Sequence, residues 1–214
     1  VLGLSSTTLF ADGHTQDYSE SGYFIFNTLL FLIGGFLVMW MAAGFAMLET
    51  GLVRSKNAST QLLKNVALFS LASIAYFIVG FNLMYPGDGW IIDGWMGGFS
   101  LTGLEPAGVG ADGVDLTYAS VGSDFFFQLM FCAATASIVS GTVAERVKLW
   151  PFLIFTIVLT GIFYPISASW QWGGGWLSEA GFSDFAGSTV VHATGAAAAL
   201  AGAMVIGARH GRYK

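Results

Sequence analysis

Five long apolar runs constrain this sequence more than any other feature. A helix needs about 20 apolar residues to cross the hydrocarbon core of a bilayer. Only 10% of the 214 residues are charged, whereas soluble domains carry about 25%. The runs are continuous and lack the apolar–polar alternation of barrel strands. We therefore predict an all-α helical membrane protein with five transmembrane helices, at residues 23–48, 65–85, 124–144, 150–170 and 187–208.

The placement of charge predicts the orientation of these helices. Cytoplasmic loops are enriched in Lys and Arg. Eleven of the thirteen acidic residues lie on the opposite side of the predicted bundle from the basic residues, and the two exceptions are Glu49 and Glu145. We therefore expect the N-terminus outside the cell and the C-terminal end of this segment in the cytoplasm. The net charge of -5 is a sum over two different faces and gives no indication of nucleic-acid binding. The basic residues follow spans one, three and five: Arg54, Lys56, Lys64, Arg146, Lys148, Arg209, Arg212 and Lys214.

The ends of the chain predict a short lead and one domain. Residues 1–11 resemble the tail of a signal peptide, with cleavage near Ala11, and the polar residues after them suit an extracytoplasmic lead. We assign residues 1–22 to this signal-peptide remnant and lead, and residues 23–214 to a single domain, since no low-complexity linker divides them. Within that domain, Pro165 should kink or end the fourth helix.

Asp184 and His192 are the most informative ionisable residues, because such groups are costly in an apolar segment. If the residues between them are helical, His192 lies about 12 Å beyond Asp184. Asp184 suits an N-cap whose carboxylate accepts from the first turn of span five, and its charge can also attract a cation to the outer mouth. His192 is either a buried histidine bonded to a neighbouring helix or a pore-lining imidazole. Small residues beginning at Gly195 leave room beside it.

Three aromatic residues have both a structural and a functional interpretation. Phe127 and Phe131 are four residues apart and share one helix face, where core or lipid-facing packing is the ordinary role. Trp172 suits an anchor at the membrane interface. It can instead offer its ring face to a cation, an interaction of about 0.5–2 kcal/mol. None of these residues is specific alone.

The remaining ionisable residues do not form a site by their spacing. Glu49 can pair with Arg54 or Lys56. His14 and His210 belong to opposite membrane faces, and no Cys, His or carboxylate spacing completes a metal shell. No nucleophile–base pair is apparent either. We therefore predict no metal, no cofactor and no catalytic residue.

Four sequence blocks together resemble the ammonium transporter family (Amt/MEP/Rh). DFAGSTVVH at residues 184–192 is similar to the family signature D-F-A-G-G-x-V-V-H, with Ser188 in place of the second glycine. The blocks GLVRSKN, GTVAERVK and WGGGW, at residues 51–57, 141–148 and 172–176, match further family blocks in the same order. The likeness runs from about residue 21 to Lys214.

The resemblance implies an architecture and partners. The family fold has eleven helices, built as two inverted five-helix halves and a last helix, and assembles as trimers with one pore per subunit. Inverted repeats with a site between the halves are a general transporter design. This chain would be the N-terminal half, the first five-helix repeat, of a multi-pass protein of the plasma (inner) membrane. Its partners would be ammonium or ammonia, the lipid bilayer, two further subunits and a cytoplasmic regulatory protein.

The resemblance also implies site residues. Trp172 and Asp184 would belong to the external recruitment site, Phe127 and Phe131 to the gate below it, and His192 would be the first of the paired pore histidines. The second histidine of the pair would lie in the other half. Ser188 is a small replacement for a small residue.

These expectations favour a transporter over an enzyme. A cation entering a narrow apolar pore pays a large desolvation cost, which favours loss of its proton. We expect NH4+ to gather at the outer mouth, to lose a proton near Phe131, and to pass His192 as NH3. Two alternatives remain, an ammonium sensor coupled to a cytoplasmic signalling module and a CO2/NH3 channel of the Rh branch.

Overall fold

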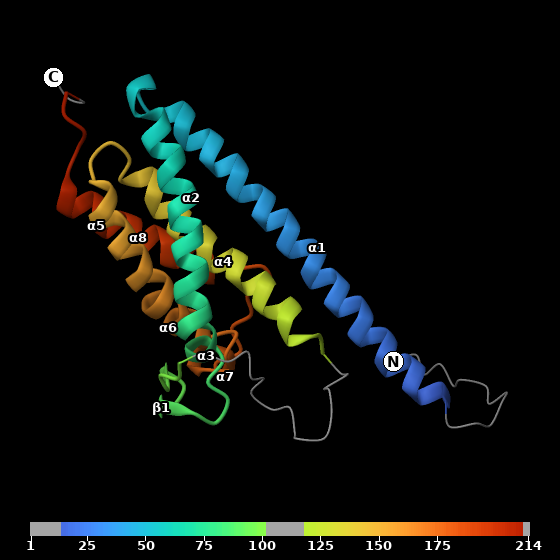
Figure 1. The fold of residues 1–214 in the computed structure, drawn as a ribbon. Helices are drawn as coiled ribbons and strands as arrows, with labels where there is room; N and C mark the ends of the chain where they lie inside the picture. Colours follow the sequence, from blue (N-terminus) through green and yellow to red (C-terminus); the bar gives the residue numbers. More distant parts are fainter. Residues whose placement is uncertain (1–13, 102–117, 212–214) are drawn as a thin grey trace.

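The computed structural model describes residues 14–101 and 118–211 (Figure 1). Four of its helical segments are long and apolar enough to cross a membrane, and a fifth apolar helix is shorter. The five predicted helices are therefore present in the predicted order, and the prediction of a helical membrane fold is confirmed. The signal-peptide prediction concerns residues 1–11, which lie outside the described residues.

The elements differ from the predicted spans mainly at their ends. The first helix begins at His14 instead of residue 23, so the predicted polar lead is partly helical. The last helix begins at Val190, after the predicted start at residue 187. In order, the elements are α1 (His14–Leu52), η1 (Ser55–Asn57), α2 (Ala58–Ala75), η2 (Tyr76–Gly80), α3 (Phe81–Met84), β1 (Trp90–Ile92), β2 (Met96–Gly97), α4 (Val121–Thr142), α5 (Leu149–Val158), η3 (Leu159–Phe163), α6 (Tyr164–Ser169), α7 (Trp176–Glu179) and α8 (Val190–Ile206).

Two spanning segments pass through a π-turn, and one of these turns accommodates a proline. η2 joins α2 to α3, and η3 joins α5 to α6. Pro165 lies in the first turn of α6, directly after η3. Proline has no backbone N–H to donate to the preceding turn of a helix, so the regular pattern of backbone hydrogen bonds is interrupted there. The expected disturbance is therefore a wider helical turn, and the helix continues to Ser169 instead of ending at Pro165.

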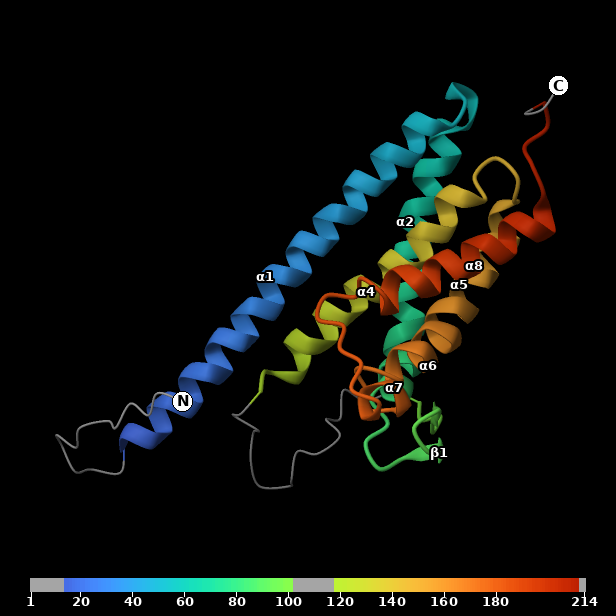
Figure 2. The same ribbon diagram turned by 180° about the vertical axis from the view of Figure 1, so that it is seen from behind.

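Helix α4 is the centre of the bundle and contacts α1, α2 and α8. In the membrane-spanning window of α4, 67% of the residues are buried, against 6% in that of α1. Helix α4 therefore packs against several helices, whereas α1 lies at the periphery of the bundle. Figures 1 and 2 show α1 along one flank of α4, with α8 crossing on the side opposite α2. Gly195 of α8 makes the close approach possible, because a Cβ there would lie 3.1 Å from the Thr135 carbonyl oxygen of α4.

The two ends of the bundle carry different structures, and we name them by their charge. The acidic end holds the β1–β2 hairpin and α7, from which the chain runs back along the bundle to the start of α8 (Figures 1 and 2). The basic end holds the α1–α2 and α4–α5 connections and the end of α8 (Figure 1). At the acidic end Trp95 stacks on Trp176, with ring centroids 4.8 Å apart. The Trp170 indole N–H donates to the Trp95 carbonyl at 2.8 Å. The hairpin is thus fixed against the WQWGGGW loop.

Glu145 joins three connections at the basic end. Its Oε1 accepts from the backbone N–H of Arg54 at 2.9 Å and from the Asn57 side-chain amide at 2.7 Å. Its Oε2 accepts from Arg209 Nη1 at 3.1 Å. Glu145 has φ +63°, a left-handed conformation that is uncommon for residues other than glycine. The side chain is 3% exposed. One carboxylate therefore ties the α1–α2 turn and the segment after α8 to the α4–α5 turn.

The predicted pairing of Glu49 with Arg54 or Lys56 is wrong. Glu49 is 3% exposed and points into the bundle, while Arg54 pairs with Glu145. The Oε2 of Glu49 accepts from three side chains on α2 and α4: Gln61 Nε2 at 2.5 Å, Asn65 Nδ2 at 2.6 Å and Ser140 Oγ at 2.9 Å. The buried Lys64 ammonium donates to the Ser140 carbonyl at 2.9 Å. Glu49 thus joins α1 to α2 and α4 inside the bundle.

Replacing Glu145 by Gln should lower the thermal stability of the protein and remove the part of that stability that depends on acid pH. The backbone N–H of Arg54, the Asn57 amide and the Arg54 guanidinium lower the pKa of Glu145 to about 2, below the usual value of about 4.3. Because the folded pKa is depressed, the stabilisation is complete above about pH 4.3 and is lost as the pH falls towards 2.

The measurement is the Tm in detergent across that pH range. The matched control is Glu179→Gln, which changes an exposed acid at the other end. Equal pH profiles for wild type and Glu145→Gln would contradict the role assigned to Glu145.

Candidate functional site

The Asp184 carboxylate organises the start of α8. Its Oδ1 accepts from the backbone N–H of Gly187 at 2.8 Å and of Ser188 at 3.1 Å. Its Oδ2 accepts from the backbone N–H of Thr189 at 2.8 Å and of Val190 at 2.7 Å. Val190 is the first residue of α8, and the other three donors belong to the turn that precedes the helix. The predicted capping role is confirmed only in part: the carboxylate accepts from the first N–H of α8, that of Val190, whereas the N-cap residue is Thr189.

Asp184 is held in its charged form. Burial by itself raises the pKa of a carboxyl group, but here the four backbone N–H donors outweigh burial and hold the pKa of Asp184 below its usual range. The side chain therefore supplies both a cap and a fixed negative charge at the acidic end. The first basic residue after it is Arg209, on the far side of α8.

The segment between Asp184 and α8 is a tight turn, not a helix. Gly187 has φ +79°, and a Cβ there would lie 2.5 Å from Val191 Cγ2, so this position requires glycine. Ser188 is exposed and has no left-handed backbone, which is why serine can replace a glycine there. The expected separation of 12 Å along a continuous helix is therefore wrong. Asp184 and His192 both contact Gly187 instead.

The predicted aromatic residues lie together beside this turn. The Trp172 indole N–H donates to the Asp184 carbonyl at 2.8 Å. Phe131 stacks on Trp172 with ring centroids 5.8 Å apart and an interplanar angle of 24°. Phe127 meets Phe131 edge-on at 4.7 Å, and the Phe31 ring of α1 stacks on Phe127 at 5.1 Å. A continuous row of rings thus runs from the Asp184 turn to α1.

His192 is exposed on the surface of this chain, in the first turn of α8. Its Nδ1 lies 3.0 Å from the Gly187 carbonyl oxygen, so it bonds within its own segment. The interpretation of His192 as a buried histidine bonded to a neighbouring helix is therefore wrong. Residues of α1 and α4, among them Phe45 and Ser137, line a small cleft with it.

The bond to Gly187 determines what His192 can offer a ligand. A carbonyl oxygen only accepts, so Nδ1 must carry the proton. In the neutral imidazole the other nitrogen, Nε2, then has a lone pair and accepts a hydrogen bond. Within the described part of the chain Nε2 has no partner. His192 therefore presents a free acceptor nitrogen on an otherwise apolar helix.

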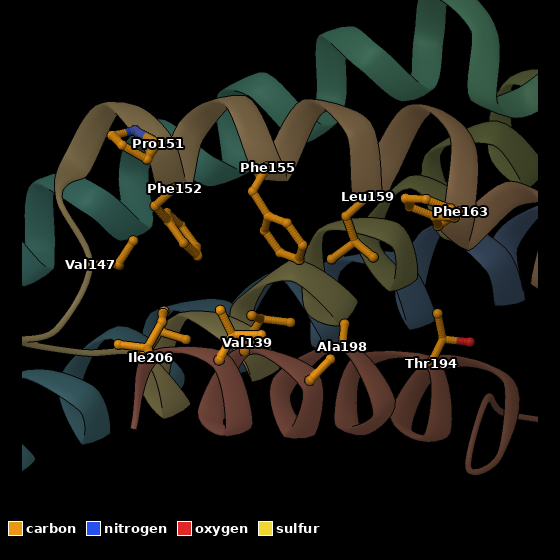
Figure 3. A pocket seen from close by; sticks show the side chains of 14 residues that line it. Val139, Val147, Pro151, Phe152, Phe155, Leu159, Phe163, Thr194, Ala198 and Ile206 are labelled. Atoms are coloured by element: carbon orange, nitrogen blue, oxygen red, sulfur yellow. The ribbon is translucent and has the colours of Figure 1, made fainter. Parts of the chain in front are cut away.

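A large groove lies elsewhere and does not suit a polar solute. A groove of about 570 Å³ lies between α5 and α8 (Figure 3). Its only polar lining residue, Thr194, shares its hydroxyl with Ser167 at 2.9 Å, so no free polar group faces the groove. Its other lining residues are apolar: Val139, Val143, Val147, Pro151, Phe152, Phe155, Leu159, Phe163, Ala198, Ala201, Gly202, Val205 and Ile206. None of the predicted site residues borders it.

Sequence reasoning missed two residues close to this site. Gly187 was part of the DFAGSTVVH block, but its role as the link between Asp184 and His192 depends on a backbone conformation that the letters do not specify. Asp124 begins the predicted third span, and its position in an apolar run was the only available signal. Among the described residues, no group of three His, Cys, Asp or Glu side chains could hold a metal ion.

Comparison with known proteins assigns this geometry to a family. The sequence profile of the Ammonium Transporter Family matches residues 29–214. The ammonium transporter Amt2 of Archaeoglobus fulgidus is 44% identical over 192 residues, which are 85% of this chain and 38% of that protein. The crystal structure of Mep2 from Saccharomyces cerevisiae matches with a TM-score of 0.72 and 26% identity, over 86% of this chain and 40% of that one.

The chain belongs to the ammonium transporter family. A variant of Mep2 from Candida albicans gives a similar match, with a TM-score of 0.72, 28% identity and coverage of 89% of this chain and 41% of that one. The chain thus spans less than half the length of these ammonium transporter relatives and corresponds to their N-terminal half. The family resemblance read from the four sequence blocks is confirmed.

Replacing Asp184 by Asn should destabilise this ammonium transporter family member by roughly 1–3 kcal/mol, the cost of leaving buried donors unpaired. Asn keeps one carbonyl oxygen, but its NH2 group would face two of the four backbone N–H donors. The Tm of the full-length parent in detergent reports the loss. Asp93→Asn, an exposed acid in the hairpin, is the matched control and should leave the Tm within error. Equal Tm values for both variants would contradict the capping role.

Proposed function

We propose that the complete protein conducts ammonium or ammonia across the plasma (inner) membrane through a histidine-lined pore. The observation that carries this proposal is the free Nε2 of His192, oriented by the Nδ1–Gly187 bond. A pore for NH3 needs a hydrogen-bond acceptor that stays uncharged, and a neutral imidazole with this tautomer meets both requirements. The family membership and the relatives named as ammonium transporters support the substrate.

The acidic end is suited to attract the cation. It holds the ionised Asp184 beside Trp172 and contains none of the eight Lys and Arg residues. A cation arriving there meets a fixed negative charge and an indole ring, which favour its recruitment. We assign the acidic end to the outer face, as the positive-inside rule requires, and Trp172 and Asp184 to recruitment.

The row of rings next to Trp172 is suited to separate NH3 from its proton. Phe131 is buried and Phe127 closes one edge of it. A cation that enters this apolar contact loses its hydration, which favours the neutral form. We assign Phe127 and Phe131 to a gate that NH4+ passes only by giving up a proton, after which NH3 reaches His192.

A closed pore at His192 requires further protein segments on the exposed side of this residue. His192 is exposed on α8, so its Nε2 is not covered by another part of this chain. We propose that residues 23–214 form the first five-helix repeat, and that the remaining length seen in the relatives completes the pore in a trimer. A cytoplasmic regulatory protein would act on the basic end.

Replacing His192 by Ala in the full-length parent should lower ammonium flux at least tenfold, because Ala offers no acceptor inside the pore. The measurement is ammonium-dependent flux into proteoliposomes, with K+ as a competing cation. His210→Ala is the matched control, since this histidine is exposed at the basic end. Unchanged flux with unchanged discrimination against K+ would contradict the pore role. A wild-type protein that binds ammonium but moves none would indicate a sensor.

A further inference from the structure

Asp124 is a buried carboxylate without a basic partner. It lies in the first turn of α4 and is 9% exposed. The other buried acids have donors or cations nearby: Asp184 has four backbone N–H groups, and Glu145 has Arg54 and Arg209. Glu49 Oε2 has two amides and the nearby Lys64, although Glu49 Oε1 has no partner among the described residues. An uncompensated buried carboxylate costs several kcal/mol. No Lys or Arg of this chain belongs to the acidic end, so a cation that neutralises Asp124 would come from outside the chain.

The neighbours of Asp124 form a set of oriented oxygen atoms. Gln128 follows one helical turn later on the same face, and its Nε2 donates to the Tyr85 hydroxyl oxygen at 2.9 Å. Tyr85 and Gln128 are the polar side chains next to the Asp124 carboxyl group. Asp124 Oδ1 and Gln128 Oε1 are nevertheless buried without a donor among the described residues. Two acceptor oxygens on adjacent turns therefore lack a donor.

Aromatic rings pack around Tyr85 and around Phe125, the residue after Asp124. Phe81 lies 5.2 Å from Tyr85 and 5.4 Å from Phe125, measured between ring centroids, and Tyr76 stacks on Phe125 at 5.8 Å. Ring faces attract cations, most strongly where water is excluded. The rings belong to the same core cluster as Phe131. The site is about 10 Å along α4 from Phe131, from seven residues at about 1.5 Å each.

We propose that Asp124, Gln128 and Tyr85 form a binding site for ammonium, separate from Trp172 and Asp184. Ammonium has N–H donors that can satisfy Asp124 Oδ1 and Gln128 Oε1. Potassium has no N–H donor and needs a fuller shell of oxygen atoms. The site concentrates the cation on the acidic side of the Phe131 ring. The proposal rests on the proposed transport of ammonium by the complete protein.

The test is the concentration dependence of ammonium flux through the full-length parent carrying Asp124→Asn. Asn has nearly the same shape but no charge, so we expect the half-saturating ammonium concentration to rise roughly tenfold, the effect of one lost charge-assisted hydrogen bond. Asp93→Asn removes the same charge from an exposed site at the same end and should shift that concentration less than twofold.

Each outcome decides between the alternatives. A half-saturating concentration within twofold of wild type in Asp124→Asn overturns the proposal and leaves the transport function intact. An equal shift in Asp93→Asn also overturns it, because the effect would then be a long-range field. Wild-type protein without any ammonium flux overturns the proposed function itself. If Asp124→Asn does not fold, Gln128→Leu is measured instead, and an unchanged half-saturating concentration there overturns the proposal.

Discussion

The hydrogen bonds of the Asp184 carboxylate determine the geometry of most of the candidate site. Its four backbone N–H donors hold the turn before α8 in a single conformation. Two carbonyl groups of that turn then accept hydrogen bonds from two different side chains. The Asp184 carbonyl accepts from Trp172 and places the indole against Phe131, whereas the Gly187 carbonyl fixes the tautomer of His192. A charge that is costly to bury thus determines the geometry of three neutral rings.

The second constraint is the separation of charge between the ends of the bundle. At the basic end Glu145 uses arginine side chains from two connections, so the carboxylate there is neutralised within the chain. Among the described residues of the acidic end no carboxylate has such a partner: Asp184 is stabilised by backbone N–H groups, and Asp124 lacks a cationic partner. The same sequence asymmetry that predicts orientation therefore also leaves negative charge where a cation would enter.

Sequence reasoning predicted the helices, because they depend on local signals, and the residues it proposed for the site lie around the turn before α8. Apolar run length predicted five helices, and Asp before a helix predicted a cap. The wrong predictions concern contacts between distant residues or special backbone conformations. Arg54 and Glu145 are 91 residues apart, so Glu49 was the nearer but incorrect partner. The turn at Gly187 was missed because GSTVV contains nothing that excludes a helix, and its left-handed glycine is visible only in three dimensions.

The central claim is that Asp184 acts by shaping the turn that orients Trp172 and His192, in addition to supplying charge. The most direct measurement is a cryo-electron microscopy structure of the full-length parent with Asp184→Ala. The account predicts that residues 185–189 change conformation, that the indole of Trp172 leaves its position on Phe131, and that the His192 ring loses its bond to the Gly187 carbonyl. An unchanged turn, with Trp172 and His192 in their present positions, would contradict the claim.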